Sequence, residues 1–419
     1  HPRIYTRHMS SLAPVDRGER FSTIDVLRGV ALLGILLMNI QDFGLPGFAY
    51  WNPTAWGGAT GADLGYWFAN QVFFEGKMRT IFSMLFGAGF LVLTGRAEAR
   101  GLEARAEIAD IYYRRTIWLM LLGTAHAFFL WWGDILMPYG FFGLFLYPLR
   151  RLAAKSLILF GLCLLFLRLP FSAYDDYEFR EIKAKGEAAL AAEKSGKKLT
   201  KQQEDDKRKW EEKKKDLVPD KEKIQKNIDE HQLGYWANFK KRYEAVSGNM
   251  GAMFTWVPTD VGGMMLIGMG LMKLGVFTGQ LSLGAYLRMM LLGYLLGAPV
   301  NAFIAWHAYQ TKWNALEPYP YWLGYDFGRL TVALGHIGLV MLICQKGWLR
   351  FLTTRLQAVG QTALSNYLLT TILCTFFFNG YGFRFFGKLA RHELLYVAAA
   401  VWTINLLWSP IWLKHFRFG

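Results

Sequence analysis

The sequence predicts an all-α protein, a polytopic membrane helix bundle of about ten transmembrane helices with one charged extracytoplasmic insertion. Hydrophobic residues make up 53% of the 419 residues, and the mean hydropathy of +0.17 is high for a soluble chain. The charge is concentrated: residues 174–248 hold 19 basic and 17 acidic groups, whereas the rest of the chain holds only 28 and 15. That remainder contains repeated apolar runs of the roughly 20 residues that a bilayer requires.

The first apolar run follows a short tail and has no small-residue cleavage site, so we interpret it as a retained span and not as a signal peptide. The predicted spans are 23–43, 77–95, 112–132, 135–151, 154–172, 251–274, 282–306, 322–345, 358–379 and 392–413. They divide the chain into a cytoplasmic tail (1–20), a first bundle (21–173), the charged insertion (174–248) and a second bundle (249–419). Residues 1–8 are interpreted as an extension added before a natural start at Met9.

Basic residues in the short loops predict the orientation. With an even number of spans, most of them fall on one face, which the positive-inside rule assigns to the cytoplasm together with both termini. This set is Arg17, Arg20, Arg96, Arg100, Arg105, Arg114, Arg115, Arg150, Arg151, Lys155, Lys346, Arg350, Arg355, Lys414 and Arg417. Arg384, Lys388 and Arg391 fall on the outer face and do not fit the rule.

The charged insertion is rich in helix-forming residues of both charges. It predicts either a hairpin of two exposed helices or a partly disordered segment. In both cases the simplest interpretation is a solvated appendage that takes no part in chemistry.

The first predicted span carries three polar groups on one broad face: Asp25, Arg28 and Asn39. At about 1.5 Å per residue, Asp25 and Asn39 lie roughly 21 Å apart along the helix. Such groups are costly in a membrane and either line a functional path or make structural contacts. Here the structural alternative is an Asp–Arg ion pair and an interhelical hydrogen bond from Asn39.

Three charges stand at the start of the second span: Glu75, Lys77 and Arg79. Glu75 and Arg79 are four residues apart, so they can pair on a helix, with Lys77 pointing away. The group either grips an anion or marks the membrane interface.

Three later positions are further candidates. His126 is either a general base or a hydrogen-bonded packing residue, and His336 has the same two interpretations. Asp134 either caps the next helix or orients a substrate. Asn366 belongs to a polar patch, residues 361–367, that either joins helices or contacts a ligand.

Several classes of protein are excluded by missing motifs. The sequence has no phosphate-binding loop, dinucleotide fingerprint, His-Glu-x-x-His motif, Cys-x-x-Cys motif or nucleophile elbow. We therefore expect no metal. Because the excess positive charge lies between apolar segments, we expect no nucleic-acid partner either.

A set of motifs resembles a known family. They include Asp-Val-Leu-Arg-Gly (25–29), Leu-Met-Asn-Ile (37–40), Phe-Gly-Leu-Pro (43–46), Leu-Phe-Gly-Ala-Gly (85–89), Gly-Asp-Ile-Leu (133–136), Gly-Met-Met-Leu-Ile-Gly (263–268) and Asn-Tyr-Leu-Leu (366–369). Together they cover nearly all the chain outside the insertion. The sequence resembles the YeiB-like family of bacterial inner-membrane proteins, long described as a domain of unknown function.

That family is similar to a wider group of transmembrane acyltransferases, which includes the heparan-glucosaminide acetyltransferase type. These take an acyl group from cytosolic acyl-CoA and pass it to an acceptor across the membrane. Asp25, Arg28 and Asn39 match their Asp-x-x-Arg-Gly start and outer Asn. The acetyltransferase type also has a catalytic His in the next outer loop. Residues 41–64 contain no His, so we expect His126 to substitute.

The resemblance implies an acyltransferase of the bacterial inner membrane, with acyl-CoA or acetyl-CoA as co-substrate. Predicted catalytic residues are Asn39, His126 and Asp134, and predicted co-substrate contacts are Asp25, Arg28, Glu75, Lys77, Arg79 and Asn366. Expected partners are membrane lipids and a small-molecule, glycan or lipid acceptor, with a homodimer left open. The alternatives are a transporter or flippase for a small molecule or lipid, and an assembly factor that binds a partner through residues 174–248.

Overall fold

A computed structural model describes residues 22–98, 102–218, 220–317, 321–416 and 419, which form helices joined by turns and loops without a strand. The predicted tail (1–20) and its extension lie outside the described residues. The elements are α1 (Ser22–Gly44), α2 (Phe48–Trp51), α3 (Gly61–Ala69), η2 (Asn70–Phe74), α4 (Lys77–Glu98), α5 (Leu102–Phe129), α6 (Leu136–Leu149), α7 (Ala154–Phe166), α8 (Arg168–Lys194), α9 (Lys201–Leu217), α10 (Lys221–His231), α11 (Tyr235–Trp256), η3 (Val257–Gly262), α12 (Gly263–Lys273), α13 (Leu283–Gln310), α14 (Tyr321–Lys346), α15 (Arg350–Gln361), α16 (Ala363–Phe378) and α17 (Leu394–His415). Here η2 and η3 are π-helical turns.

The all-α fold class is confirmed, and the chain is a membrane protein. Six described helical stretches are long and apolar enough to cross a bilayer, and Leu136–Leu149 and Ala363–Phe378 are shorter apolar helices. The count of ten spans stays a prediction, because three predicted ranges do not match single helices. Span 154–172 takes in α7 and the start of α8, span 251–274 takes in the end of α11, η3 and α12, and span 358–379 breaks at Thr362 between α15 and α16.

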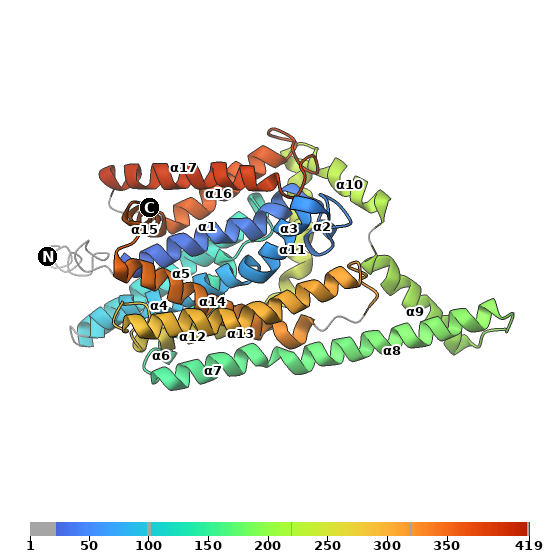
Figure 1. Cartoon of the computed structure of the whole chain (residues 1–419), viewed down its shortest axis with the longest axis horizontal. Coiled ribbons are helices and arrows are strands. Elements are labelled where there is room, and N and C mark those ends of the chain that lie inside the picture. The colour runs from blue at the N-terminus through green and yellow to red at the C-terminus, as the bar shows by residue number, and fades with distance from the viewer. Residues whose placement is uncertain (1–21, 99–101, 219, 318–320, 417–418) are drawn as a thin grey trace, which may run out of the picture.

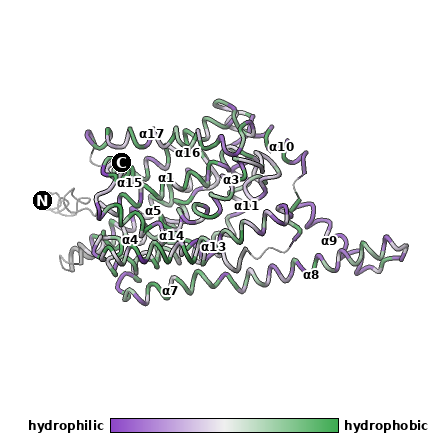
Figure 2. Tube along the Cα trace, in the orientation of Figure 1, coloured by the Kyte–Doolittle hydropathy of each residue, from purple (hydrophilic) through white to green (hydrophobic). Residues whose placement is uncertain are grey.

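Helix α1 runs through the middle of the bundle, with α16 and α17 on one side and α12 to α14 on the other (Figure 1). It is buried along nearly its whole length, whereas α13 exposes leucines such as Leu291 and Leu295, as a lipid-facing helix would. Figure 2 shows an apolar bundle with polar α9 and α10 beyond one end. We call that the insertion end; the start of α1 and the end of α17 lie at the opposite end (Figure 1).

The crossing of α1 and α15 depends on two glycines. A Cβ atom on Gly29 would collide with the carbonyl of Leu356, and one on Gly360 would collide with the carbonyl of Asp25. The two backbones therefore touch, as small residues allow between membrane helices. This contact fixes the Asp25 end of α1 against the short helix α15.

The predicted helical hairpin in the insertion is confirmed as α8 and α9. Trp210 is buried against Gly186, where a Cβ atom would not fit, and Lys207 pairs with Glu193 at 2.7 Å. The remainder of the insertion returns to the bundle. The His231 ring stacks on Phe386 at 3.8 Å between centroids, and the Gly380 N–H donates to the His231 carbonyl at 2.7 Å. Only the α8–α9 hairpin is thus an appendage, while α10 covers the insertion end.

We expect the cover formed by α10 to loosen in acid. Burial and the Lys241 ammonium, 3.4 Å from Nδ1, lower the pKa of His231 from 6.5 to about 4, although Glu230 opposes this. Because the folded state binds the proton more weakly than the unfolded state, the stabilisation is complete above pH 6.5 and is lost as the pH falls through 4. Hydrogen exchange in residues 221–238, corrected for intrinsic rates, should rise at pH 4.5 relative to pH 7 in wild type but much less in His231→Phe. Equal protection of wild type at the two pH values would refute this prediction.

One of the three basic residues predicted to lie on the outer face is buried. Arg391 is 0% exposed and donates to the carbonyls of Ala49 at 2.8 Å and Trp56 at 3.0 Å, and to the side chain of Gln41. It holds the loop after α1 in place and does not face a membrane surface. Because its side chain is buried in the protein, Arg391 can depart from the positive-inside rule, which concerns basic residues in exposed loops.

Candidate functional site

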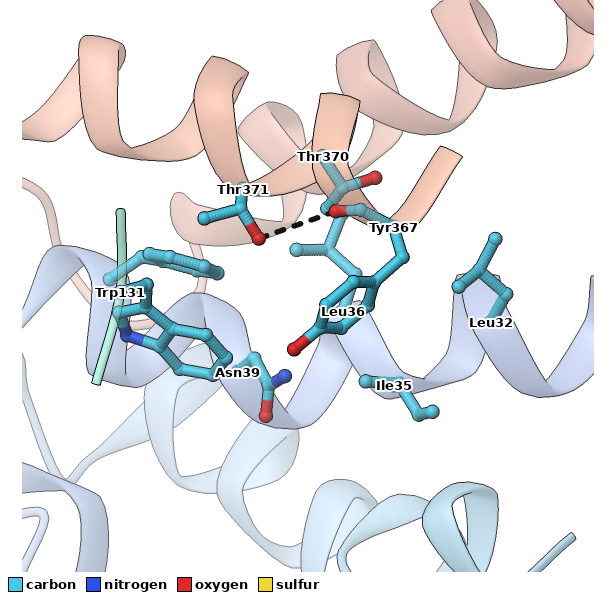
Figure 3. Close-up of a pocket in the computed structure, with 9 residues that line it drawn as sticks. Leu32, Ile35, Leu36, Asn39, Trp131, Tyr367, Thr370 and Thr371 are labelled. Carbon is cyan, nitrogen blue, oxygen red and sulfur yellow. Dashed lines mark hydrogen bonds between the residues drawn. The ribbon is translucent and has the colours of Figure 1, made fainter. Parts of the chain in front are cut away.

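A small cavity lies between α1 and α16 near the insertion end (Figure 3). Its lining is Leu32, Ile35, Leu36, Asn39, Phe43, Trp131, Tyr367, Thr370 and Thr371. Among the lining residues of α1, Leu32, Ile35 and Leu36 are apolar, and the polar Asn39 lies nearer the insertion end. The cavity has room for roughly one water molecule, so a larger substrate requires the two helices to move apart.

The amide of Asn39 faces this cavity. Figure 3 shows the Asn39 amide and the Tyr367 hydroxyl pointing towards one another. Asn39 is half-buried, and its side chain has no hydrogen-bond partner among the described residues. The structure therefore does not show the predicted interhelical hydrogen bond from Asn39, and its amide N–H groups are available to a molecule in the cavity.

His126 lies in the last turn of α5 and is 2% exposed. Its Nδ1 is 2.9 Å from Asp134 Oδ2, a close contact that is not an aligned hydrogen bond, and its Nε2 is 3.0 Å from Thr371 Oγ1. A carboxylate on one ring nitrogen and a hydroxyl on the other is the arrangement of an oriented general base.

The turn after α5 brings Asp134 back to His126. The His126 carbonyl accepts from both Leu130 N and Trp131 N, which closes the helix. Asp134 Oδ1 then accepts from Met137 N at 2.7 Å, so the predicted helix cap is confirmed. Trp131 Nε1 donates to Asp42 Oδ2 at 3.0 Å and ties this turn to α1. Asp134 thus starts α6 with one oxygen and faces His126 with the other.

Sequence reasoning missed Thr371. It follows Tyr367 by one helical turn, and this spacing was the signal that could have extended the polar patch at residues 361–367. Thr371 lines the cavity and is 2% exposed.

At the opposite end, Arg28 Nη1 and Asp25 Oδ1 form the predicted ion pair at 2.8 Å. Asn366 lies near them and is 0% exposed, with an amide that donates to Thr362 Oγ1 and Ser409 Oγ and accepts from Trp408 Nε1. It joins α15, α16 and α17, which is the helix-joining alternative. Its contact with a co-substrate stays a prediction.

The predicted pairing of Glu75 with Arg79 is wrong. Gly76 has a φ of +74°, so no regular helix joins them. Glu75 instead accepts from the Tyr325 hydroxyl at 3.4 Å, and Arg79 pairs with Asp260 at 3.2 Å. Lys77 is 1% exposed and donates to the Gln71 carbonyl at 2.6 Å. These three residues flank Met78, which packs against Gly34 about midway along α1, beyond Arg28. The six predicted co-substrate contacts therefore fall into two separate groups.

Asp260 is the centre of a second buried cluster. Arg329, which is 0% exposed, lies 3.0 Å from both oxygens of Asp260 and 2.7 Å from Asp326. Arg79 and Arg168 complete the set at 3.2 and 3.8 Å. Asp260 lies in η3, and the π-helical turn η2 precedes Glu75. Neither Asp260 nor Arg329 was among the site residues predicted from the sequence.

Comparison with known proteins decides the family. The uncharacterized protein YeiB of Escherichia coli (strain K12) is 32% identical over 417 residues, which cover 96% of this chain and 94% of that protein. The chain belongs to the YeiB-like family. The uncharacterized protein YxaH of Bacillus subtilis (strain 168) is 26% identical and covers 98% of the chain. A family profile described as a protein of unknown function (DUF418) matches residues 271–419.

The DUF418 profile covers Thr371 but not Asn39 or His126. No solved structure matches the chain. The descriptions of these relatives name no activity.

Proposed function

We propose that the protein is a transmembrane acyltransferase that moves an acyl group from acyl-CoA to an acceptor at or across the membrane. The supporting observation is the position of His126, which lies between the buried Asp134 carboxylate and the Thr371 hydroxyl, beside a cavity with a free amide. A base oriented by a carboxylate and a nearby N–H donor are the groups that acyl transfer requires.

Each residue has a definite role in this proposal. Asn39 donates its amide N–H to the oxyanion that develops on the thioester carbonyl. His126 accepts the proton of the attacking hydroxyl or amine. Asp134 orients the imidazole and stabilises its charged form.

The donor is proposed to approach along α1 from the end that holds Arg28. Asn39 lies 11 residues beyond Arg28, about 16 Å along a helix that rises about 1.5 Å per residue. Leu32, Ile35 and Leu36 give the cavity an apolar side towards Arg28, which suits the arm of the co-substrate. Coenzyme A phosphates would then remain near Arg28 and the neighbouring basic loops.

We further propose that the protein lies in the bacterial inner membrane with both termini in the cytoplasm and the α8–α9 hairpin outside. The bacterial relatives and the positive-inside pattern support this orientation. In a cysteine-free background, Ser195→Cys at the hairpin tip should react with a membrane-impermeant maleimide in intact cells. Trp348→Cys, in the exposed turn between α14 and α15, should react only after lysis. The reverse pattern would invert the orientation.

The acyltransferase activity can be tested by adding labelled acetyl-CoA and longer acyl-CoAs to the purified protein in lipid nanodiscs. We expect binding, and release of coenzyme A that accelerates when a membrane extract supplies an acceptor. Absence of binding for every acyl-CoA would overturn the proposal.

A transporter or flippase remains the second candidate, because the Asp260 cluster places several charges inside the bundle, as transport proteins often do. The chemical form of the product distinguishes a transporter from an acyltransferase. A transporter would move a substrate across proteoliposomes unchanged, whereas an acyltransferase would leave a new ester or amide.

A further inference from the structure

We propose that Thr371 is the nucleophile that first receives the acyl group, so that transfer proceeds in two steps through an acyl-threonine. This inference rests on the proposed acyl transfer and specifies which hydroxyl His126 deprotonates first. It adds Thr371, on α16, to the proposed catalytic residues Asn39, His126 and Asp134.

The three side chains form a connected series. Thr371 Oγ1 lies 3.0 Å from His126 Nε2, and His126 Nδ1 lies 2.9 Å from Asp134 Oδ2. A nucleophile, a base within hydrogen-bonding distance and a carboxylate that orients the base are the components of nucleophilic acyl transfer. With the imidazole proton on Nδ1, towards the carboxylate, Nε2 is free to accept the threonine proton.

Thr371 differs from the other two hydroxyls that line the cavity. Thr370 Oγ1 accepts a hydrogen bond from Asn405 Nδ2 at 3.0 Å. The Tyr367 hydroxyl accepts from Ile135 N at 3.3 Å and lies 3.5 Å from Asp134 Oδ2. Of the three, Thr371 has its hydroxyl against the histidine.

His126 does not itself line the cavity, whereas Thr371 does. A thioester in the cavity therefore meets the threonine oxygen before the imidazole. From the cavity inwards, the groups therefore follow in the order Thr371, His126 and Asp134. This arrangement favours attack on the thioester by Thr371 over direct deprotonation of an acceptor by His126.

A threonine in a helix often has a purely local role, donating to the carbonyl four residues earlier. Elsewhere in this chain such bonds range from 2.7 Å for Thr259 and Thr331 to 3.4 Å for Thr353. For Thr371 the distance to the Tyr367 carbonyl is 3.3 Å, longer than its 3.0 Å contact with His126. The hydroxyl thus contacts both groups and lies nearer to the histidine nitrogen than to the carbonyl of its own helix.

The reaction balances without another reagent. Thr371 Oγ1 attacks the thioester carbonyl carbon as its proton passes to His126 Nε2, and the oxyanion faces the Asn39 amide. The tetrahedral adduct then breaks its C–S bond, and the departing thiolate takes the proton to give coenzyme A. In the second step the acceptor hydroxyl or amine attacks the ester carbon and gives its proton to His126. The C–O bond to Thr371 breaks, and the threonine oxygen recovers that proton.

To test this two-step reaction, wild-type protein in nanodiscs is mixed with acetyl-CoA that is labelled in the acetyl group, without an acceptor. After acid quenching and proteolysis, mass spectrometry should find one acetyl group on Thr371. Thr371→Ser should retain the label and the transfer, whereas Thr371→Val, of similar shape, should lose the label and at least about 10²-fold of the transfer rate. Thr375→Val, one turn further along α16 and outside the cavity lining, is the matched control and should retain both.

The outcomes separate this inference from the proposed function. If acetyl transfer from coenzyme A persists while Thr371 is never acetylated, or if Thr371→Val transfers normally, Thr371 is not the nucleophile and the acyltransferase assignment stands. If no variant or wild-type protein turns over any acyl-CoA, the proposed function itself fails. Thermal unfolding of Thr371→Val near the wild-type temperature confirms that lost transfer is not lost folding.

Discussion

Replacing His126 by alanine is expected to lower the rate of acyl transfer by about 10²- to 10⁴-fold, the usual contribution of a general base. The substitution removes the only imidazole within 3.0 Å of Thr371 among the described residues and leaves Asp134 with its helix-capping bond to Met137. Because the cap remains, α6 should still start correctly. Measurement of kcat and KM for acyl-CoA in nanodiscs should show a fall in kcat with little change in KM.

His336 supplies the matched control. It is also a histidine within the bundle, but its nitrogens contact the Tyr294 hydroxyl and the Phe73 carbonyl, both at 2.8 Å, away from the cavity. His336→Ala should therefore keep most of the transfer activity. If His126→Ala were as active as His336→Ala, the role given to His126 would be wrong.

Replacing Asp260 by alanine is expected to destabilise the folded protein by about 3–5 kcal/mol, because it leaves the buried guanidinium of Arg329 without one of its two carboxylates. Arg79 loses its ion-pair partner in the same step. Unfolding of the variant in mixed micelles, followed by circular dichroism or tryptophan fluorescence, should show the loss.

An exposed ion pair provides the comparison for that experiment. Asp205 and Arg208 are 2.7 Å apart on α9, and both side chains are more than half exposed. Asp205→Ala should cost less than about 1 kcal/mol, since solvent screens the pair. An Asp260→Ala variant as stable as Asp205→Ala would mean that the Asp260 cluster contributes little to folding, and its charges would then need a functional explanation.

Features of the fold that depend on local sequence were predictable. The apolar runs predicted the all-α bundle, and the spacing of Asp25 and Arg28 predicted their ion pair. The mixed charges of the insertion predicted a helical hairpin, now seen as α8 and α9, as one of two alternatives. Predictions failed where one residue changes the backbone. Gly76 turns left-handed and separates Glu75 from Arg79, and the break at Thr362 divides a predicted span. A glycine or threonine in an apolar run does not reveal such a break without its tertiary contacts.

The candidate site was predictable only in part, for a related reason. Asn39, His126 and Asp134 stand out because amides and ionisable groups are rare in apolar helices. Thr371 does not, since threonine is common in such helices and its partner His126 lies 245 positions away. Arg329 and Asp260 are likewise 69 positions apart. Long-range pairs of this kind appear only when the helices are packed.

Transmembrane acyl transfer can be tested in one measurement with sealed proteoliposomes. Labelled acetyl-CoA is supplied on the side of the termini, and a bacterial glycan and lipid extract is supplied on the hairpin side. We expect labelled acetyl esters or amides to accumulate in the extract with wild-type protein, and with His336→Ala, but not with His126→Ala. Label that crosses as intact acetyl-CoA, or that stays on the donor side with every acceptor tried, would contradict the acyltransferase function.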